Sequence, residues 1–213
     1  MRIISGWAKG RKLIPPPAKS TIIRPTTDRA RESLFNIIAD KIQGASVLDL
    51  FAGTGALGLE ALSRGAHSVC FVDSHPLALD LINRNMQICM DAFNHQPEVQ
   101  NDKNNRHPHE LGAVTLIKHD LRRGLPIFSK KTPPITGFDL IFLDPPYSQG
   151  LSSQLLHALE ASSFLSHHSL LIVEDRSNET LPKQMSKLTL LDQRKYGDTG
   201  FWFYHPLPDA PTP

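Results

Sequence analysis

The chain of 213 residues is 40% hydrophobic and 21% charged, so it is long enough for one well-buried core and short for two. It holds no apolar run of about 18 residues, and its first residues lack the layout of a signal peptide, so we expect a cytoplasmic protein without a membrane anchor. The net charge of +2 is divided unevenly: residues 1–45 carry nine Lys or Arg against three Asp or Glu, residues 46–213 carry 14 against 18, and the basic surface is therefore expected on the N-terminal part.

The first residues are predicted to form a small basic extension. Residues 2–5 and 12–14 suit a hairpin around Gly6 and Gly10, from which basic side chains including Arg11 project. A basic cluster of this kind fits contact with nucleic acid, and it fits an ordinary solvated arm equally well. Both interpretations stay open at this point.

A helix is predicted next, since Thr27 or Asp28 can cap its free N–H groups. Three apolar residues at helical spacing form its predicted buried face, namely Leu34, Ile37 and Ile38. This arrangement leaves Arg29 and Arg31 exposed or partly exposed, and Gly44 is expected to end the segment.

Residues 47–66, VLDLFAGTGALGLEALSRGA, predict a strand, a glycine turn and a helix. The spacing of Gly53, Gly55 and Gly58 matches the G-x-G-x-x-G fingerprint, in which glycines allow a tight turn and let a ligand approach the helix N-terminus. A tight turn without a ligand would give the same pattern. The acidic residues around the turn favour the ligand.

Asp73 follows the apolar run 68–72 and lies 20 residues after Gly53, where a carboxylate can accept hydrogen bonds from ribose hydroxyls. Asp49, just before the turn, would repel a pyrophosphate and favours a cationic ligand. S-adenosylmethionine combines a ribose with a sulfonium and an ammonium and carries no phosphate. The D-x-F-x-G-x-G pattern that begins at Asp49 also resembles the first motif of Rossmann-like methyltransferases, so we expect S-adenosyl-L-methionine as the cofactor.

The middle of the chain predicts a helix, a polar loop and a strand. The helix begins at His75 and Pro76. Its core stripe is predicted to hold Leu79, Ile82, Met86 and Cys89. Residues 94–112 predict a surface loop, and a strand at 114–117 follows. Asp120 then stands where a doubly wound sheet binds ligands, so its carboxylate could meet an adenine amine. A cap for the residues after it is an equal alternative.

The remaining apolar runs complete an α/β fold. We predict strands at 138–143, 170–173, 188–191 and 201–204, a helix at 151–165 and a frayed tail at 206–213. Strands that alternate with helices and end in two consecutive strands predict a Rossmann-like, doubly wound and mostly parallel sheet with an antiparallel C-terminal strand. This domain is expected at 46–205, with a small N-terminal extension at 1–45, and we expect a monomer.

Asp144, Pro145, Pro146 and Tyr147 directly follow the strand at 138–143. An exocyclic base amine is a weak nucleophile, so a catalyst must hold it with acceptors, here the Asp144 carboxylate and the Pro145 carbonyl. Two prolines stiffen such a loop and donate no N–H. The Tyr147 ring offers a stacking surface for a base. The pattern therefore predicts methylation of a base amine, and the alternative is a turn that only ends a strand.

Two other chemistries are disfavoured. Methylation of cytosine at C5 needs a Cys nucleophile, whereas Cys70 and Cys89 fall in a strand and a helix as small core residues. The ten His complete no familiar set of metal ligands, so we expect no metal.

Three segments resemble the RsmD family, whose members are bacterial 16S ribosomal RNA (guanine-N2)-methyltransferases. They are RPTTDRARESLFN at 24–36, DLFAGTGALGLEALSRGA at 49–66 and LDPPY at 143–147, and the resemblance covers almost the whole chain. It implies S-adenosylmethionine as methyl donor, a guanine of 16S ribosomal RNA as acceptor, and a small-subunit particle in assembly as partner.

The resemblance also implies roles for single residues. Asp49, Gly53 and Gly55 would border the donor, Asp73 would hold its ribose, and Asp120 would lie by its adenine. The guanine amine would be held by Asp144, Pro145, Pro146 and Tyr147. The RNA side would be lined by Arg24, Thr26, Arg29 and Arg31, to which the charge asymmetry adds Arg11.

Two alternatives remain. The Asp-Pro-Pro-Tyr chemistry also suits a DNA adenine-N6 or cytosine-N4 methyltransferase, although no separate target-recognition domain is visible in the 213 residues. A nucleic-acid-binding protein that no longer catalyses could keep the same scaffold, but the intact Asp144 and Tyr147 speak against it.

Overall fold

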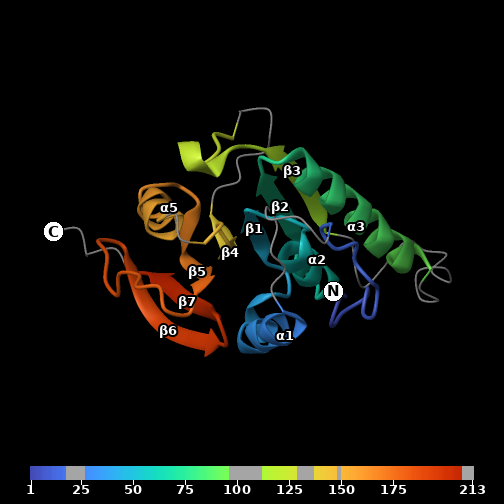
Figure 1. Cartoon of the computed structure of the whole chain (residues 1–213), viewed down its shortest axis with the longest axis horizontal. Coiled ribbons are helices and arrows are strands. Elements are labelled where there is room, and N and C mark those ends of the chain that lie inside the picture. The colour runs from blue at the N-terminus through green and yellow to red at the C-terminus, as the bar shows by residue number, and fades with distance from the viewer. Residues whose placement is uncertain (18–26, 96–111, 129–136, 148–149, 208–213) are drawn as a thin grey trace.

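The structure is a computed structural model and describes residues 1–17, 27–95, 112–128, 137–147 and 150–207. The described residues form one sheet of seven strands in the order β3-β2-β1-β4-β5-β7-β6 (Figure 1). The strands are β1 (Ser46–Leu50), β2 (Ser68–Asp73), β3 (Ala113–Lys118), β4 (Phe138–Leu143), β5 (Leu165–Arg176), β6 (Leu188–Tyr196) and β7 (Thr199–Pro206). β1 to β5 run parallel, and β7 pairs antiparallel with both β5 and β6. The predicted doubly wound sheet with an antiparallel C-terminal strand is confirmed.

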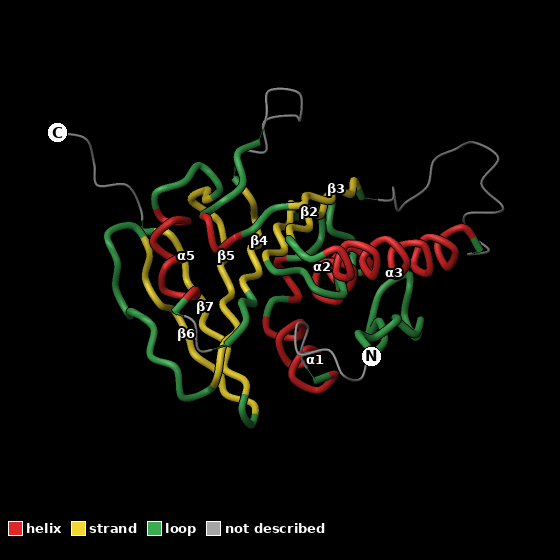
Figure 2. The backbone as a smooth tube through the Cα atoms, turned by 45° about the horizontal axis from the view of Figure 1, so that its top comes forward, coloured by secondary structure: helices red, strands yellow, loops and turns green. Residues whose placement is uncertain are grey.

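Helices cover both faces of the sheet. They are α1 (Asp28–Ile37), α2 (Ala56–Ser63), α3 (Pro76–Asn94) and α5 (Leu151–Glu160), with the 3-10 turns η1 (Ala39–Lys41) and η2 (Leu121–Arg123). α1, α2 and α3 lie on one side and α5 on the other (Figure 2). Because successive strand residues point to opposite faces, Val47 joins the core under α1 to α3, whereas Leu48 and Leu50 join the core under α5. Burial on both faces is what a parallel sheet requires.

The N-terminal extension packs onto α2 and α3. One antiparallel bridge joins Arg2 and Lys12, so the expected hairpin is reduced to a single pair. Gly6, with a φ of 80°, lies so close to α2 that a Cβ there would fall 1.7 Å from the Ser63 carbonyl oxygen. The buried Glu60 carboxylate accepts hydrogen bonds of 2.7 and 3.0 Å from two backbone N–H groups of the extension. The extension therefore shares the core of the sheet domain.

The buried face of α1 differs from the prediction. Thr27 caps the helix as expected, since its hydroxyl accepts a hydrogen bond from Ala30 N. Arg31, however, is only 1% exposed, and its Nη2 donates to the Arg2 carbonyl and to Asp28 Oδ1. The prediction that Arg31 is exposed is wrong, because the first residues of the chain pack over it. Ile37 is correspondingly exposed, at 41%.

Two boundaries in the second half were also predicted wrongly. The helix expected at 151–165 ends at Glu160, and the strand expected at 170–173 begins at Leu165. The physical reason is the pairing of Leu165 with Phe138 in the sheet, where the Phe164 and Phe138 rings pack with centroids 5.8 Å apart. None of the described helices combines the length and apolar character needed to cross a lipid bilayer.

Candidate functional site

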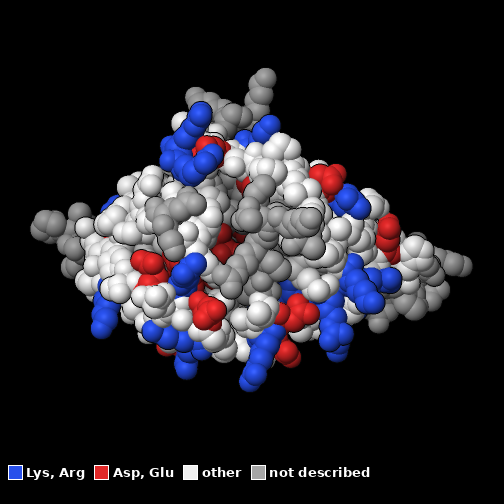
Figure 3. Space-filling model, viewed as in Figure 1, with Lys and Arg blue, Asp and Glu red and all other residues white. Residues whose placement is uncertain are grey.

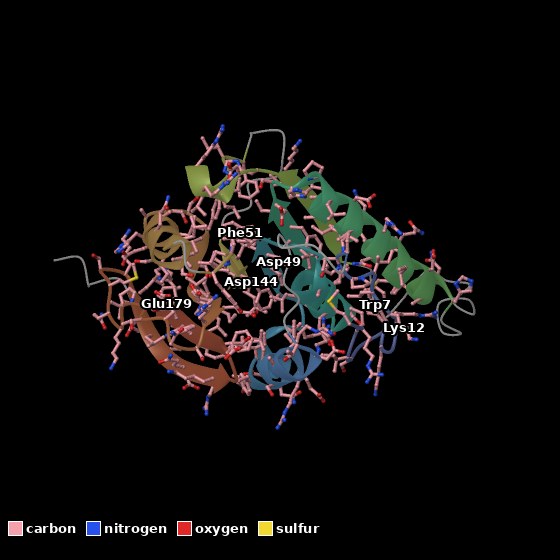
Figure 4. All side chains as sticks on the ribbon, viewed as in Figure 1. Trp7, Lys12, Asp49, Phe51, Asp144 and Glu179 are labelled. Atoms are coloured by element: carbon pink, nitrogen blue, oxygen red, sulfur yellow. The ribbon has the colours of Figure 1, made fainter. Side chains whose placement is uncertain are left out.

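The carboxyl ends of β1 and β4 bring two of the predicted motifs together. The glycine turn follows β1, the Asp-Pro-Pro-Tyr loop follows β4, and the two strands are neighbours in the sheet. Asp144 N donates to the Leu50 carbonyl at 3.3 Å, which joins the start of one loop to the end of the other strand. Asp49, Phe51 and Asp144 accordingly lie close together at the centre of the molecule (Figure 4). Residues almost a hundred positions apart thus share one site.

The glycine turn is left-handed at three positions. Gly53 and Gly55 have φ values of 57° and 77°, and Phe51 at 59° is the one non-glycine residue with positive φ in the described parts of the chain. Gly58 serves a different purpose, because a Cβ there would fall 2.3 Å from the Phe71 ring of β2. The first two glycines thus shape the turn, and the third lets α2 pack closely on the sheet.

Asp73 holds the turn at the end of β2. Its Oδ2 accepts a hydrogen bond from Gly53 N at 3.0 Å, and its Oδ1 accepts one from His75 N at 2.9 Å. The side chain remains partly exposed, so lone pairs are left for another donor. Its predicted contact with ribose stays a prediction, and the geometry is compatible with it.

Asp49 faces α2 from beneath the turn. The residue is 1% exposed, and its Oδ2 accepts a hydrogen bond from Gly58 N at 2.9 Å. Burial raises the pKa of Asp49 to about 7, and the nearby charge of Asp73 adds to the rise. The Asp49 carboxylate therefore holds the first turn of α2 in place, and its predicted contact with a donor stays a prediction.

Asp144 stands among other acids. Burial, followed by the charges of Glu174, Asp49 and Asp175, raises the pKa of Asp144 well above its ordinary value. Glu174 and Asp175 lie at the end of β5 and are 3% and 5% exposed. Carboxylates this close repel one another, so the cluster gains from a bound cation. In the space-filling view, acidic atoms are visible in a hollow near the centre of the face, and Lys and Arg stand around it (Figure 3).

The rest of the loop is stiff and faces β5. Pro145 is buried and Pro146 is exposed. The Tyr147 hydroxyl donates to Glu174 Oε1 at 3.4 Å, and the Arg176 guanidinium carbon lies 5.8 Å from the centroid of the Tyr147 ring. Neither Glu174 nor Arg176 was predicted from the sequence to have a role. The strand alternation could have revealed them, since residues 174 and 176 share one face at the carboxyl end of β5.

Asp120 caps η2. Its Oδ1 accepts hydrogen bonds from Arg122 N at 3.2 Å and from Arg122 Nε at 2.8 Å. The pKa of Asp120 is lowered, and the largest cause is its hydrogen bond with the Arg122 side chain. Of the two alternatives, the cap is confirmed, and a contact with adenine stays a prediction. Within the described residues, no group of three His, Cys, Asp or Glu is arranged to hold a metal ion.

The residues predicted for the RNA side differ in their exposure to solvent. Arg11 and Arg29 are exposed. Arg24 and Thr26 lie outside the described residues. Arg31 is buried between α1 and the first residues of the chain, and its Nε and Nη1 have no hydrogen-bond partner there. An enclosed guanidinium cannot meet a surface ligand, so Arg31 no longer belongs to this set.

The two cysteines are core residues, as predicted. Cys70 of β2 and Cys89 of α3 are both buried, and burial raises the pKa of each thiol to about 12. A thiol of this kind stays protonated near neutral pH and is a poor nucleophile.

Comparison with known proteins gives consistent matches over nearly the full chain. The family model described as conserved hypothetical protein 95 matches residues 1–205. The Escherichia coli K12 protein named ribosomal RNA small subunit methyltransferase D is 31% identical, with 96% of this chain and 89% of the relative covered. YlbH of Bacillus subtilis is 34% identical over 96% and 98%. The solved structure of YhhF from Escherichia coli, 28% identical, superposes with a TM-score of 0.69 over 97% of both chains.

Proposed function

Because the chain belongs to the family of conserved hypothetical protein 95, the RsmD family, we propose that it methylates the exocyclic N2 amine of a guanine in 16S ribosomal RNA, with S-adenosyl-L-methionine as donor. The observation that carries this proposal is the position of Asp144 and its loop beside the glycine turn. An acceptor for an amine and a turn suited to a nucleoside ligand then share one edge of the sheet.

The residues present fit the donor. Four acids, Asp49, Asp144, Glu174 and Asp175, lie close enough together to raise the pKa of Asp144. A ligand with a sulfonium and an ammonium would supply the positive charge that this cluster lacks. Asp73, partly exposed at the end of β2, is the candidate for the ribose hydroxyls. When bound, the donor supplies an electrophilic methyl group on sulfur.

Asp144 and Pro145 are the candidates for holding the acceptor. The Asp144 carboxylate accepts one N–H of the guanine amine and the Pro145 carbonyl accepts the other, which turns the nitrogen toward the methyl group. Transfer of the methyl group to the amine nitrogen would require the amine to lose a proton. A carboxylate whose pKa is raised is suited to take it.

Tyr147 is the candidate for positioning the base. Its hydroxyl is held by Glu174, so the ring has a defined orientation at the edge of the site. Stacking a base on an aromatic ring is worth about 1–3 kcal/mol, which helps to offset the cost of taking the guanine out of its own stack.

We assign the RNA side to the basic extension, residues 1–45, and the chemistry to residues 46–205. Exposed Arg11 and Arg29 support this assignment, and Arg24 and Thr26 complete the proposed set. Lysines and arginines around the central hollow would meet RNA phosphates while the acids inside meet the cationic donor (Figure 3). The proposed partner is a small-subunit particle in assembly, and we also propose that the protein is a cytoplasmic monomer that needs no metal.

The test is transfer of a labelled methyl group from S-adenosylmethionine to small-subunit particles that lack the modification, followed by nucleoside analysis of the digested RNA. We expect the label in N2-methylguanosine. Asp144→Asn should abolish the signal, whereas Asp192→Asn, which alters an exposed carboxylate of β6, should leave it intact. Label in duplex DNA instead would favour the adenine-N6 or cytosine-N4 alternative, and donor binding without any transfer would favour the non-catalytic one.

A further inference from the structure

Tyr147 is held from one strand by two residues. The carboxylate of Glu174 accepts its hydroxyl hydrogen at 3.4 Å, and the guanidinium of Arg176 lies over its ring at 5.8 Å from the centroid. Glu174 and Arg176 are two positions apart on β5 and therefore project from the same face. Asp175 between them turns the other way and accepts a hydrogen bond from Ser152 Oγ of α5 at 2.5 Å. The end of β5 thus presents an acid and a cation to the ring proposed to receive the base.

The Arg176 side chain keeps its hydrogen-bonding capacity. The residue is exposed, and within the part of the chain that the structure describes no carboxylate forms an ion pair with it. Arg194 on β6 differs, because its Nε is paired with Asp192 Oδ2 at 2.7 Å. A guanidinium that lies over an aromatic ring can still donate through its N–H groups, and their fork matches a phosphate.

The acidic residues near Tyr147 create a negative charge that the Arg176 guanidinium can offset. Asp144, Glu174 and Asp175 gather negative charge at the site, and that charge repels the RNA backbone which must come close when the guanine enters. A fixed positive charge beside the stacking ring would offset the repulsion at the point where the target nucleotide is attached to its strand.

We propose that Arg176, stacked on Tyr147, donates hydrogen bonds to a backbone phosphate next to the target guanosine. This inference rests on the proposed function and extends the acceptor site from the loop after β4 to the end of β5. It makes Arg176 a binding residue for the RNA that plays no part in holding the donor.

The experiment compares Arg176→Ala, Arg176→Lys and the control Arg194→Ala. For each, methyl transfer to small-subunit particles is measured against particle concentration and KCl concentration, and the Kd for S-adenosylmethionine is measured by calorimetry. We expect Arg176→Ala to lower kcat/KM for the particle about tenfold, as for the loss of one charge-assisted hydrogen bond. The slope of log(kcat/KM) against log[KCl] is expected to be negative, and its magnitude should decrease by roughly 0.7–0.9, as for the loss of one phosphate contact. The donor Kd should stay within about twofold.

Arg176→Lys should keep the salt slope and recover only part of the lost kcat/KM, because the charge remains and the planar fork is gone. Arg194→Ala should match the wild type. If Arg176→Ala behaves like Arg194→Ala, or loses activity with an unchanged salt slope, the phosphate contact is refuted while the methyltransferase assignment stands. Wild-type protein that transfers no methyl group to RNA would instead overturn the proposed function, and this inference with it.

Discussion

Replacement of Asp49 by Asn should change how stability depends on pH. Burial raises the pKa of Asp49 from an ordinary value of 3.8 to about 7 in the folded protein. The folded state therefore binds this proton more tightly than the unfolded state, and the group contributes most stability below pH 4 and loses it as pH rises to 7. With about 1.4 kcal/mol per pKa unit, the loss between pH 5 and pH 8 is on the order of 2–3 kcal/mol. Asn at this position accepts the Gly58 N–H without titrating.

The assay is urea unfolding of the donor-free protein at pH 5, 6, 7 and 8. The stability of Asp49→Asn relative to wild type should rise across this series by roughly 2–3 kcal/mol, in steps that grow smaller above pH 7. Asp139→Asn is the matched control, because Asp139 also accepts a backbone N–H, from Ser46 at 2.8 Å, but is exposed to water. Parallel curves for Asp49→Asn and wild type over the whole range would refute the reasoning.

Further predictions concern the donor, the acceptor and the turn. A cationic donor should lower the pKa of Asp49, which is about 7 in the free protein, so binding of S-adenosylmethionine near pH 7 should release protons, seen as a calorimetric enthalpy that varies with the ionisation enthalpy of the buffer. Asp144→Asn should lower kcat by about 10²–10⁴ and change donor Kd far less, and equal losses in both would contradict an acceptor role. Gly58→Ala should destabilise the fold by roughly 1–3 kcal/mol in urea titrations, since its Cβ meets the Phe71 ring at 2.3 Å. Arg29→Ala should reduce the salt slope of RNA binding by about 1, and an unchanged slope would place Arg29 away from RNA.

The doubly wound, mostly parallel sheet could be predicted because its strands are short apolar runs that end in turn or acidic residues. Val47 to Leu50 and Phe138 to Leu143 are typical buried strands, and parallel strands end at one edge of a sheet. The order of the strands was not predicted, and the structure shows that β1 and β4 are neighbours. The boundary between α5 and β5 was missed, because residues 161–165 are apolar enough for a helix. It is Phe138, far away in sequence, that pairs with Leu165.

The burial of Arg31 follows from helical spacing that the prediction overlooked, because Arg31 lies at i, i+3 and i+7 with Leu34 and Ile38 and so shares the buried face of α1. The sequence did not show which residues cover this side chain, and these are the first residues of the chain. Its neighbour Glu60 on α2 raises the Arg31 pKa by charge, while burial, the larger effect, lowers it. The resemblance assigned Arg31 to the RNA side, whereas in the structure it connects α1 to the first residues of the chain. A contact between segments distant in sequence decided the boundary of β5, and for Arg31 it decided which residues cover the side chain.

The acidic cluster links stability to the proposed activity. Asp49 and Asp144 have raised pKa values for the same reasons, burial and neighbouring carboxylates, and both make the unliganded protein less stable as pH rises. A cation in the site removes part of that repulsion. The affinity for the cationic donor should therefore increase over the same pH range in which the unliganded protein loses stability. Methyl transfer then turns the sulfonium into a neutral thioether and releases a proton at the same place. The spent donor would thus lack the sulfonium charge, although it keeps its ammonium, and the proton taken up by Asp144 would reduce the negative charge of the site. Both changes weaken the attraction between the acids and the spent donor, which favours its release.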